Sequence, residues 1–206
     1  SNSYWDGAYS GLLSADRLIA DLHTMEVAYL ENDKNELEIT RDVYLDELPV
    51  EGSQNQTYQG KLKLEDEVKD FEFKITKQLF DDEFKNHYFR RIRNIQLRIT
   101  LCEDGPNTIL EPKECRRISA ELSLTQNTLY LKGSENIPNR VGIQTIATSS
   151  AHLEGNEFNF KFVGEKYCPF EGAGVESSWL LSVPGIKGSQ IDKVILTISY
   201  TARKGA

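Results

Sequence analysis

The sequence holds few of the residues that build covalent or metal-centred cores. Its 206 residues include three cysteines, three histidines and one methionine. Three cysteines are too few for a disulfide-rich scaffold, and Cys102, Cys115 and Cys168 lack the paired spacing of a zinc site. None of the histidines has a second histidine at metal-ligand spacing. We therefore expect no metal and no other cofactor, and a disulfide between Cys102 and Cys115 across a hairpin stays open.

Long apolar runs and an excess of basic residues are also missing. No run approaches the apolar length that a membrane-spanning helix needs. The chain has 24 Lys and Arg residues against 32 Asp and Glu residues, which gives a net charge of −8. Nucleic-acid binding requires clustered basic residues, and the one cluster, Arg90, Arg91 and Arg93, lies among acidic neighbours. We therefore expect no nucleic-acid partner.

The sequence also lacks a recognisable catalytic motif. No Gly-x-Ser-x-Gly elbow occurs, and Gly172-Ala-Gly174 is not followed by the Lys-Ser/Thr or the helix start of a phosphate loop. The run Asp81-Asp-Glu83 lacks the glycine and distal glutamate of a calcium loop, so we interpret it as a solvated charge run. A glycosidase with paired carboxylates stays open, but nothing selects a pair. We therefore expect a protein that is not an enzyme.

What the chain does have, at its start, is a helical pattern. We set aside Ser1-Asn2 as a cloning remnant and take the chain for a fragment of a longer protein. Residues 6–35 are predicted to form a long helix, because apolar residues recur at spacings of three and four. The apolar face of this predicted helix consists of Ala15, Leu18, Ile19, Leu22, Met25 and Tyr29. It would cover the chain's own domain or contact another helix or another copy of the chain.

From Leu37 onward the apolar period changes to two, which is typical of half-buried strands. The predicted strands are 37–45, with Arg41-Asp42 at a turn or bulge, and 62–64, 71–75, 95–101, 118–124, 129–131, 142–150, 158–162, 179–183 and 194–200. Residues 79–87 are interpreted as an irregular connection. The expected fold is mainly β: an antiparallel β-sandwich of about 8–10 strands, preceded by the helix. The expected domains are 1–36 and 37–206.

The stretch Tyr167–Leu181 is the most distinctive part of the chain. Gly172 and Gly174 permit backbone angles that other residues resist, and Trp179 opens an alternating strand that ends before Pro184. The pattern predicts a tight connection between two strands. We interpret Phe170 and Trp179 as core or turn-packing residues and Arg90 and Arg91 as surface groups at a strand entry, and each could also contact a partner.

Four stretches in order resemble the C-terminal region of the A subunit of insecticidal toxin complexes, the Tc toxins. They are Tyr4-Trp-Asp-Gly-Ala-Tyr-Ser-Gly11 with the helix after it; Leu79-Phe-Asp-Asp-Glu-Phe-Lys-Asn-His-Tyr-Phe-Arg-Arg-Ile-Arg93; Ile146-Ala-Thr-Ser-Ser150; and Pro169-Phe-Glu-Gly-Ala-Gly-Val-Glu-Ser-Ser-Trp179 with the ending Val194–Arg203. The resemblance covers nearly the whole chain. Glu176 and the charged loop 102–115 depart from the family's usual pattern.

The resemblance implies a structural role in a secreted bacterial toxin. Residues 37–206 would dock the β-propeller of the B subunit, and residues 1–36 would end a channel helix of a homopentameric A subunit. Membrane contact would come only from parts outside this chain. The family-motif residues, structural or interfacial, are Phe170, Glu171, Gly172, Gly174, Trp179, Arg90 and Arg91. Docking specificity is expected on loops such as 52–60 and 134–140.

Two other functions stay open. β-Sandwiches also present carbohydrate- or receptor-binding sites on their loops, for which Tyr58, Tyr130 and Tyr167 are the aromatic candidates. A glycosidase-like enzyme is the weaker alternative.

Overall fold

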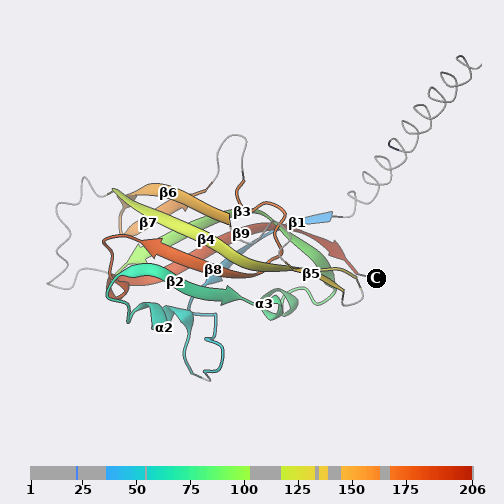
Figure 1. The fold of residues 1–206 in the computed structure, drawn as a ribbon, viewed down its shortest axis with the longest axis horizontal. Coiled ribbons are helices and arrows are strands. Elements are labelled where there is room, and N and C mark those ends of the chain that lie inside the picture. The colour runs from blue at the N-terminus through green and yellow to red at the C-terminus, as the bar shows by residue number, and fades with distance from the viewer. Residues whose placement is uncertain are drawn as a thin grey trace, which may run out of the picture. The chain divides into compact units, whose positions relative to one another are not determined.

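The computed structural model describes Leu22 and residues 36–53, 55–102, 117–132, 135–138, 145–162 and 168–205 (Figure 1). The chain divides into two units, Ser1–Glu36 and Leu37–Ala206, and we call the second unit the β-domain. Leu22 is helical and 56% exposed. The other residues of the predicted helix face, Ala15, Leu18, Ile19, Met25 and Tyr29, lie outside the described residues. The long helix and its oligomer contact therefore stay predictions.

Strands dominate the β-domain. They are β1 (Glu36–Tyr44), β2 (Val68–Ile75), β3 (His87–Leu101), β4 (Arg117–Tyr130), β5 (Asn136–Pro138), β6 (Thr145–Glu154), β7 (Glu157–Lys161), β8 (Glu176–Val183) and β9 (Ile191–Lys204). Short helices α2 (Tyr58–Leu62) and α3 (Lys77–Asp81) and a 3-10 turn, η1 (Gly188–Gln190), complete the described elements. Within the described ranges, no helix has the length and apolarity to cross a membrane.

The strands form one curled sheet with the order β1-β9-β3-β7-β6-β4-β8-β2, and β5 pairs with β4. All pairs from β9 to β2 along this path are antiparallel, which confirms the predicted mainly β, antiparallel class. The expected sandwich had two separate sheets. Here the β6–β7 hairpin connects them, through Leu153 opposite Phe158 and Glu154 opposite Glu157. We call β6, β4, β8 and β2 the front half, because they lie toward the viewer in Figure 1, and β1, β9, β3 and β7 the back half.

One hydrophobic core fills the space that the curled sheet encloses. Leu97 of β3 and Leu196 of β9 share it with Leu122 of β4 and Leu181 of β8, and all four are fully buried. Burying each such side chain contributes about 1.5–3 kcal/mol. The two halves therefore stabilise each other through side chains, although the hairpin is their main backbone link.

One of the predicted strands was wrong. The predicted strand 62–64 is the last residue of helix α2 and the turn after it, and α2 begins where Thr57 Oγ1 accepts a hydrogen bond from Gly60 N at 3.2 Å. Leu62 is buried and Leu64 is 77% exposed, so the two leucines do not share a face as they would in a strand. Arg41 and Asp42 lie inside β1, which excludes the turn, and the bulge stays a prediction.

Candidate docking surface

The segment Gly172-Ala-Gly174 lies between β3 and β4 and is hydrogen-bonded to both strands. Gly172 has a φ of +86°, as the sequence predicts for a tight connection. Gly172 N donates to Ile92 O at 2.8 Å, and Gly174 N donates to the side-chain Oδ1 of Asn127 at 2.9 Å. A Cβ on Gly174 would stand 2.0 Å from Thr128 O, so this glycine is required for space rather than for its φ.

Phe170 and Trp179 pack in the core. Their ring centroids are 4.9 Å apart at an interplanar angle of 79°, an edge-to-face pair. The indole Nε1 of Trp179 donates to Ser177 Oγ at 2.7 Å, which satisfies the one polar atom of a fully buried side chain. Glu171, by contrast, is half exposed and lies 3.5 Å from the guanidinium of Arg93.

Arg90 is a buried ion-pair partner, so the interpretation as a surface group was wrong. Its side chain is 4% exposed, and its Nη1 lies 2.6 Å from Asp81 Oδ1. Burial alone would raise the pKa of Asp81, but hydrogen bonds from Lys77 and Arg90 outweigh it and lower that pKa. Glu83 accepts from Arg41 at 2.9 Å. The acidic run therefore ties α3 to β3 and β1 and is not simply solvated.

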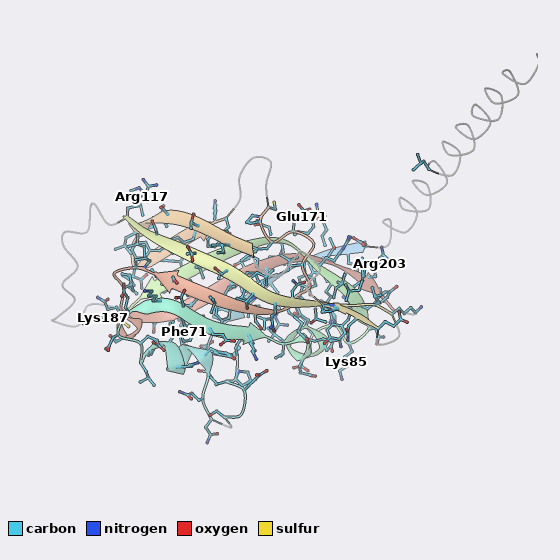
Figure 2. The ribbon with its side chains drawn as sticks, in the orientation of Figure 1. Phe71, Lys85, Arg117, Glu171, Lys187 and Arg203 are labelled. Carbon is cyan, nitrogen blue, oxygen red and sulfur yellow. The ribbon has the colours of Figure 1, made fainter. Side chains whose placement is uncertain are left out.

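Arg91 lies beside Arg90 but in a different setting. It is half-buried, and its guanidinium lies 4.8 Å from the ring centroid of Phe89. The guanidinium of Arg203 lies 4.3 Å from the same ring. Phe89 has a φ of +53°, an uncommon angle for an aromatic residue, at the irregular start of the β3–β9 pairing. Arg203 and Lys85 are labelled at the right of Figure 2, opposite the end that carries Arg117 and Lys187.

The outer surface of the back half is polar, and its side chains bond to one another. Arg98 donates to Asp42 at 2.8 Å, and Thr197 donates to the same carboxylate at 2.5 Å. The hydroxyls of Thr40 and Ser199 lie 3.1 Å apart. We call this surface the back face. Its lateral bonding is typical of a solvated sheet surface.

The outer surface of β6, β4 and β8 is different, and we call it the front face; next to it, charge stands on Arg117 at the start of β4 and on Glu72 and Lys74 of β2. Its side chains alternate with core residues and are Ile146, Thr148 and Ser150 of β6; Ser119, Glu121, Ser123 and Gln126 of β4; and Ser178, Leu180 and Ser182 of β8. Only Glu121 in this set is charged, although charged residues make up 27% of the chain. This face was not predicted, although hydroxyl residues at alternate positions of these strands, and the stretch Ile146–Ser150, mark it.

A groove lies beside the front face, at the β2 side of the front half. Its volume is about 290 Å³, and it is lined by Glu51, Lys74, Ile75, Thr76, Gln126, Asn127, Thr128, Glu176, Ser177 and Ser178. Lys74 Nζ lies 2.7 Å from Glu51 Oε2. Glu176 accepts from the Tyr130 hydroxyl at 2.7 Å and from the backbone N–H of Lys77 at 3.2 Å. The groove therefore contains two carboxylates and one ammonium group.

The two described aromatic candidates for a sugar platform, Tyr58 and Tyr130, do not present open rings. Tyr58 is 5% exposed and packs edge-to-face on Phe71. The ammonium of Lys77 lies 5.4 Å from the ring centroid of Tyr130. Burial and the hydrogen bond to Glu176 raise the pKa of Tyr130 to about 12. Tyr167 lies outside the described residues.

Across the residues that the structure covers, no three His, Cys, Asp or Glu side chains gather into a potential metal site. Cys102 and Cys168 have free thiols, and Cys115 is outside the described ranges.

The fold is a curled antiparallel sheet with one charge-poor outer face and an adjoining groove, and such a fold does not by itself define a function. Comparison with known protein families identifies one family over nearly the whole chain. The chain belongs to the family described as the Tc toxin complex TcA C-terminal TcB-binding domain, whose model matches residues 1–202.

Two relatives show how the chain relates to larger proteins. The toxin subunit YenA2 of Yersinia entomophaga is 27% identical over 212 residues, which cover 98% of this chain and 15% of YenA2. A cryo-EM structure of Yersinia pseudotuberculosis TcaA-TcaB shares the fold, with a TM-score of 0.54 and 21% identity over 95% of this chain and 11% of that one. The chain thus spans a small part of each relative's length.

Proposed function

We propose that this chain is a non-catalytic assembly module of a Tc-toxin A subunit, and that residues 37–206 dock the β-propeller of a B subunit and seat it on a pentameric translocation channel. The observation that carries the proposal is the family match over residues 1–202. The absence of a catalytic motif in the sequence agrees with it, as does a surface with one charge-poor face. As part of such a toxin, the protein would be secreted or released from the bacterium.

Binding to a B subunit is the direct test. A TcB-type subunit encoded in the same genome is immobilised, and the 206-residue chain is passed over it in biolayer interferometry. We expect saturable binding. A β-sandwich protein of similar size and net charge serves as the control. No binding at about 100 μM, a standard free energy weaker than about −5.5 kcal/mol, would contradict the proposal.

The proposed role of residues 1–36 in the pentamer has a separate test. Replacing Leu22 and Met25 by Asp places charges on the predicted helix face. In the full-length protein, we expect native mass spectrometry to show loss of the oligomer. The thermal unfolding midpoint of the 206-residue chain should stay unchanged. A lower midpoint would indicate instead that the helix packs on the core of the β-domain.

A further inference from the structure

We propose that the front face is the surface on which the B subunit docks, and that a basic side chain of that partner enters the adjoining groove. The inference rests on the proposed function and adds the location and the chemistry of the contact. It follows from three features of the described residues: an apolar centre, a surround of hydroxyl groups, and an acidic groove at one side.

The apolar centre lies on one row of the sheet. Ile146 of β6 and Leu180 of β8 both pair with Ser123 of β4, so the three side chains stand next to one another. Ile146 is 53% exposed, and Leu180 is half-buried. Ser123 is 4% exposed, although it points out of the core, because its small side chain lies between these two large ones. An exposed apolar pair of this kind is a natural anchor for a partner surface.

Hydroxyl groups surround this centre. On one side, Ser119 and Ser150 face each other with their oxygens 3.0 Å apart. Thr148 and Ser182 stand on either side of Glu121 in the next row. Hydroxyls lose less free energy on leaving water than charged groups do, and the centres of protein interfaces are depleted of charge. The back face also has hydroxyl groups, on Thr40, Thr197 and Ser199, but it carries the Arg98–Asp42 ion pair among them.

Charge is concentrated at the β2 side of the front face. Glu72 of β2 pairs with Leu180, so it extends the central row toward the groove. The groove adds Glu51 and Glu176, against the single ammonium of Lys74. The excess of carboxylates favours a cationic side chain of the partner, and both carboxylates already have fixed orientations from Lys74 and Tyr130.

The size of the face sets the expected strength of binding. Three strand spacings of about 4.8 Å and about nine residues of strand length give a surface on the order of 400 Å². A standard protein interface buries about 800 Å² on each partner. One copy therefore provides about half of a standard interface, and we expect weak binding by the single chain that several copies together would strengthen.

The apolar centre is tested with a matched pair of variants. Ile146→Asp places a charge at the centre of the front face, and Leu64→Asp makes the same change at a 77% exposed leucine outside it. Both positions are exposed, so both variants should keep the wild-type circular dichroism and unfolding midpoint. We expect Ile146→Asp to raise the Kd for the immobilised TcB-type subunit at least about tenfold, and Leu64→Asp to change it by less than about twofold.

A second matched pair of variants tests the contribution of charge to binding. Glu72→Lys and Glu38→Lys reverse one exposed carboxylate on each edge strand, Glu72 beside the groove and Glu38 on the back face. We expect Glu72→Lys to slow association about three- to tenfold at low salt, with the difference shrinking as salt is added. Glu38→Lys should leave the association rate unchanged.

The outcomes separate the two levels of the proposal. If the wild-type chain does not bind the subunit, the proposed function fails. If the wild type binds and Ile146→Asp and Glu72→Lys bind equally well, docking occurs elsewhere and this inference is wrong. If Ile146→Asp changes self-association in analytical ultracentrifugation but leaves subunit binding intact, the front face contacts a second copy of the chain, which also overturns the inference.

Discussion

Replacing Gly174 by alanine should destabilise the β-domain more than the same replacement at Gly60 or Gly52. The added Cβ would lie 2.0 Å from Thr128 O and 2.3 Å from Thr128 C. Relieving this contact requires a backbone movement of about 1 Å, and overpacking of this kind costs about 1–3 kcal/mol. The movement would also weaken the hydrogen bond from Gly174 N to Asn127.

The magnitude follows from these two contributions. A buried hydrogen-bonding group left without its partner costs about 1–3 kcal/mol. The total is then about 2–6 kcal/mol, a large part of the 5–15 kcal/mol that is typical for a domain. For a domain of this length, we expect the unfolding midpoint to fall by about 4–24 °C. Urea denaturation and scanning calorimetry measure both quantities.

Two other glycines serve as controls that separate space from backbone angle. Gly60 lies in α2, and a Cβ there would be 3.6 Å from Thr57 Oγ1, so Gly60→Ala should be neutral or stabilise by about 0.5–1 kcal/mol. Gly52 has a φ of +78° with nothing near its Cβ position, so Gly52→Ala should cost about 1–2 kcal/mol. If Gly174→Ala costs no more than Gly52→Ala, the reasoning about space at Gly174 is refuted.

Three further predictions concern hydrogen-bonded polar groups. Asp81→Asn should cost about 2–3 kcal/mol at neutral pH, because it leaves the charge of buried Arg90 without its partner. Since the native pKa of Asp81 lies below 3.8, the wild-type advantage should persist above that pH and disappear as pH falls through the native pKa, which urea denaturation at a series of pH values can follow. Ser177→Ala should cost about 1–3 kcal/mol, since it removes the acceptor of the Trp179 indole; a double-mutant cycle with Trp179→Phe should show most of that cost as coupling. Tyr130 should ionise only near its raised pKa of about 12, so its contribution to stability should be lost between about pH 10 and 12, and phenolate absorbance compared with Tyr130→Phe would show the shift.

The sequence predicted most strands of the β-domain because their alternation is clean. Phe71, Phe73 and Ile75 of β2 point into the core, and β8 begins before Trp179 and ends at Val183, before Pro184. The curled single sheet was not predicted, because a sequence pattern shows which residues face a core and not how the strands pair. The pairing of β1, the first strand, with β9, the last, could not be predicted for this reason.

Bulges explain the strands whose lengths were wrong. β4 was predicted as two strands, 118–124 and 129–131, and is one strand from Arg117 to Tyr130. A register shift between Leu124 and Gln126 reverses the alternation in its middle. β3 begins eight positions before the predicted Ile95, where two further shifts hide the period of two.

The functional surface was harder to predict than the fold. The family motif identified the buried packing of Phe170, Gly174 and Trp179, because packing residues are what give such a motif its regularity. The front face consists of serines, Thr148, Gln126, Glu121 and two apolar residues, and no single motif in the sequence marks this set. Only the register of β6, β4 and β8 brings Ile146, Ser123 and Leu180 together.

The position of β9 has a consequence for how the protein is made. β9 lies between β1 and β3 in the sheet, although it ends at Lys204. On the ribosome, β1 and β3 emerge long before their shared neighbour is synthesised, and each then exposes an unpaired edge that invites aggregation. The back half can close only after β9 has left the exit tunnel. Ribosome stalling or premature termination before Ile191 should therefore yield an aggregation-prone nascent chain rather than a smaller folded domain.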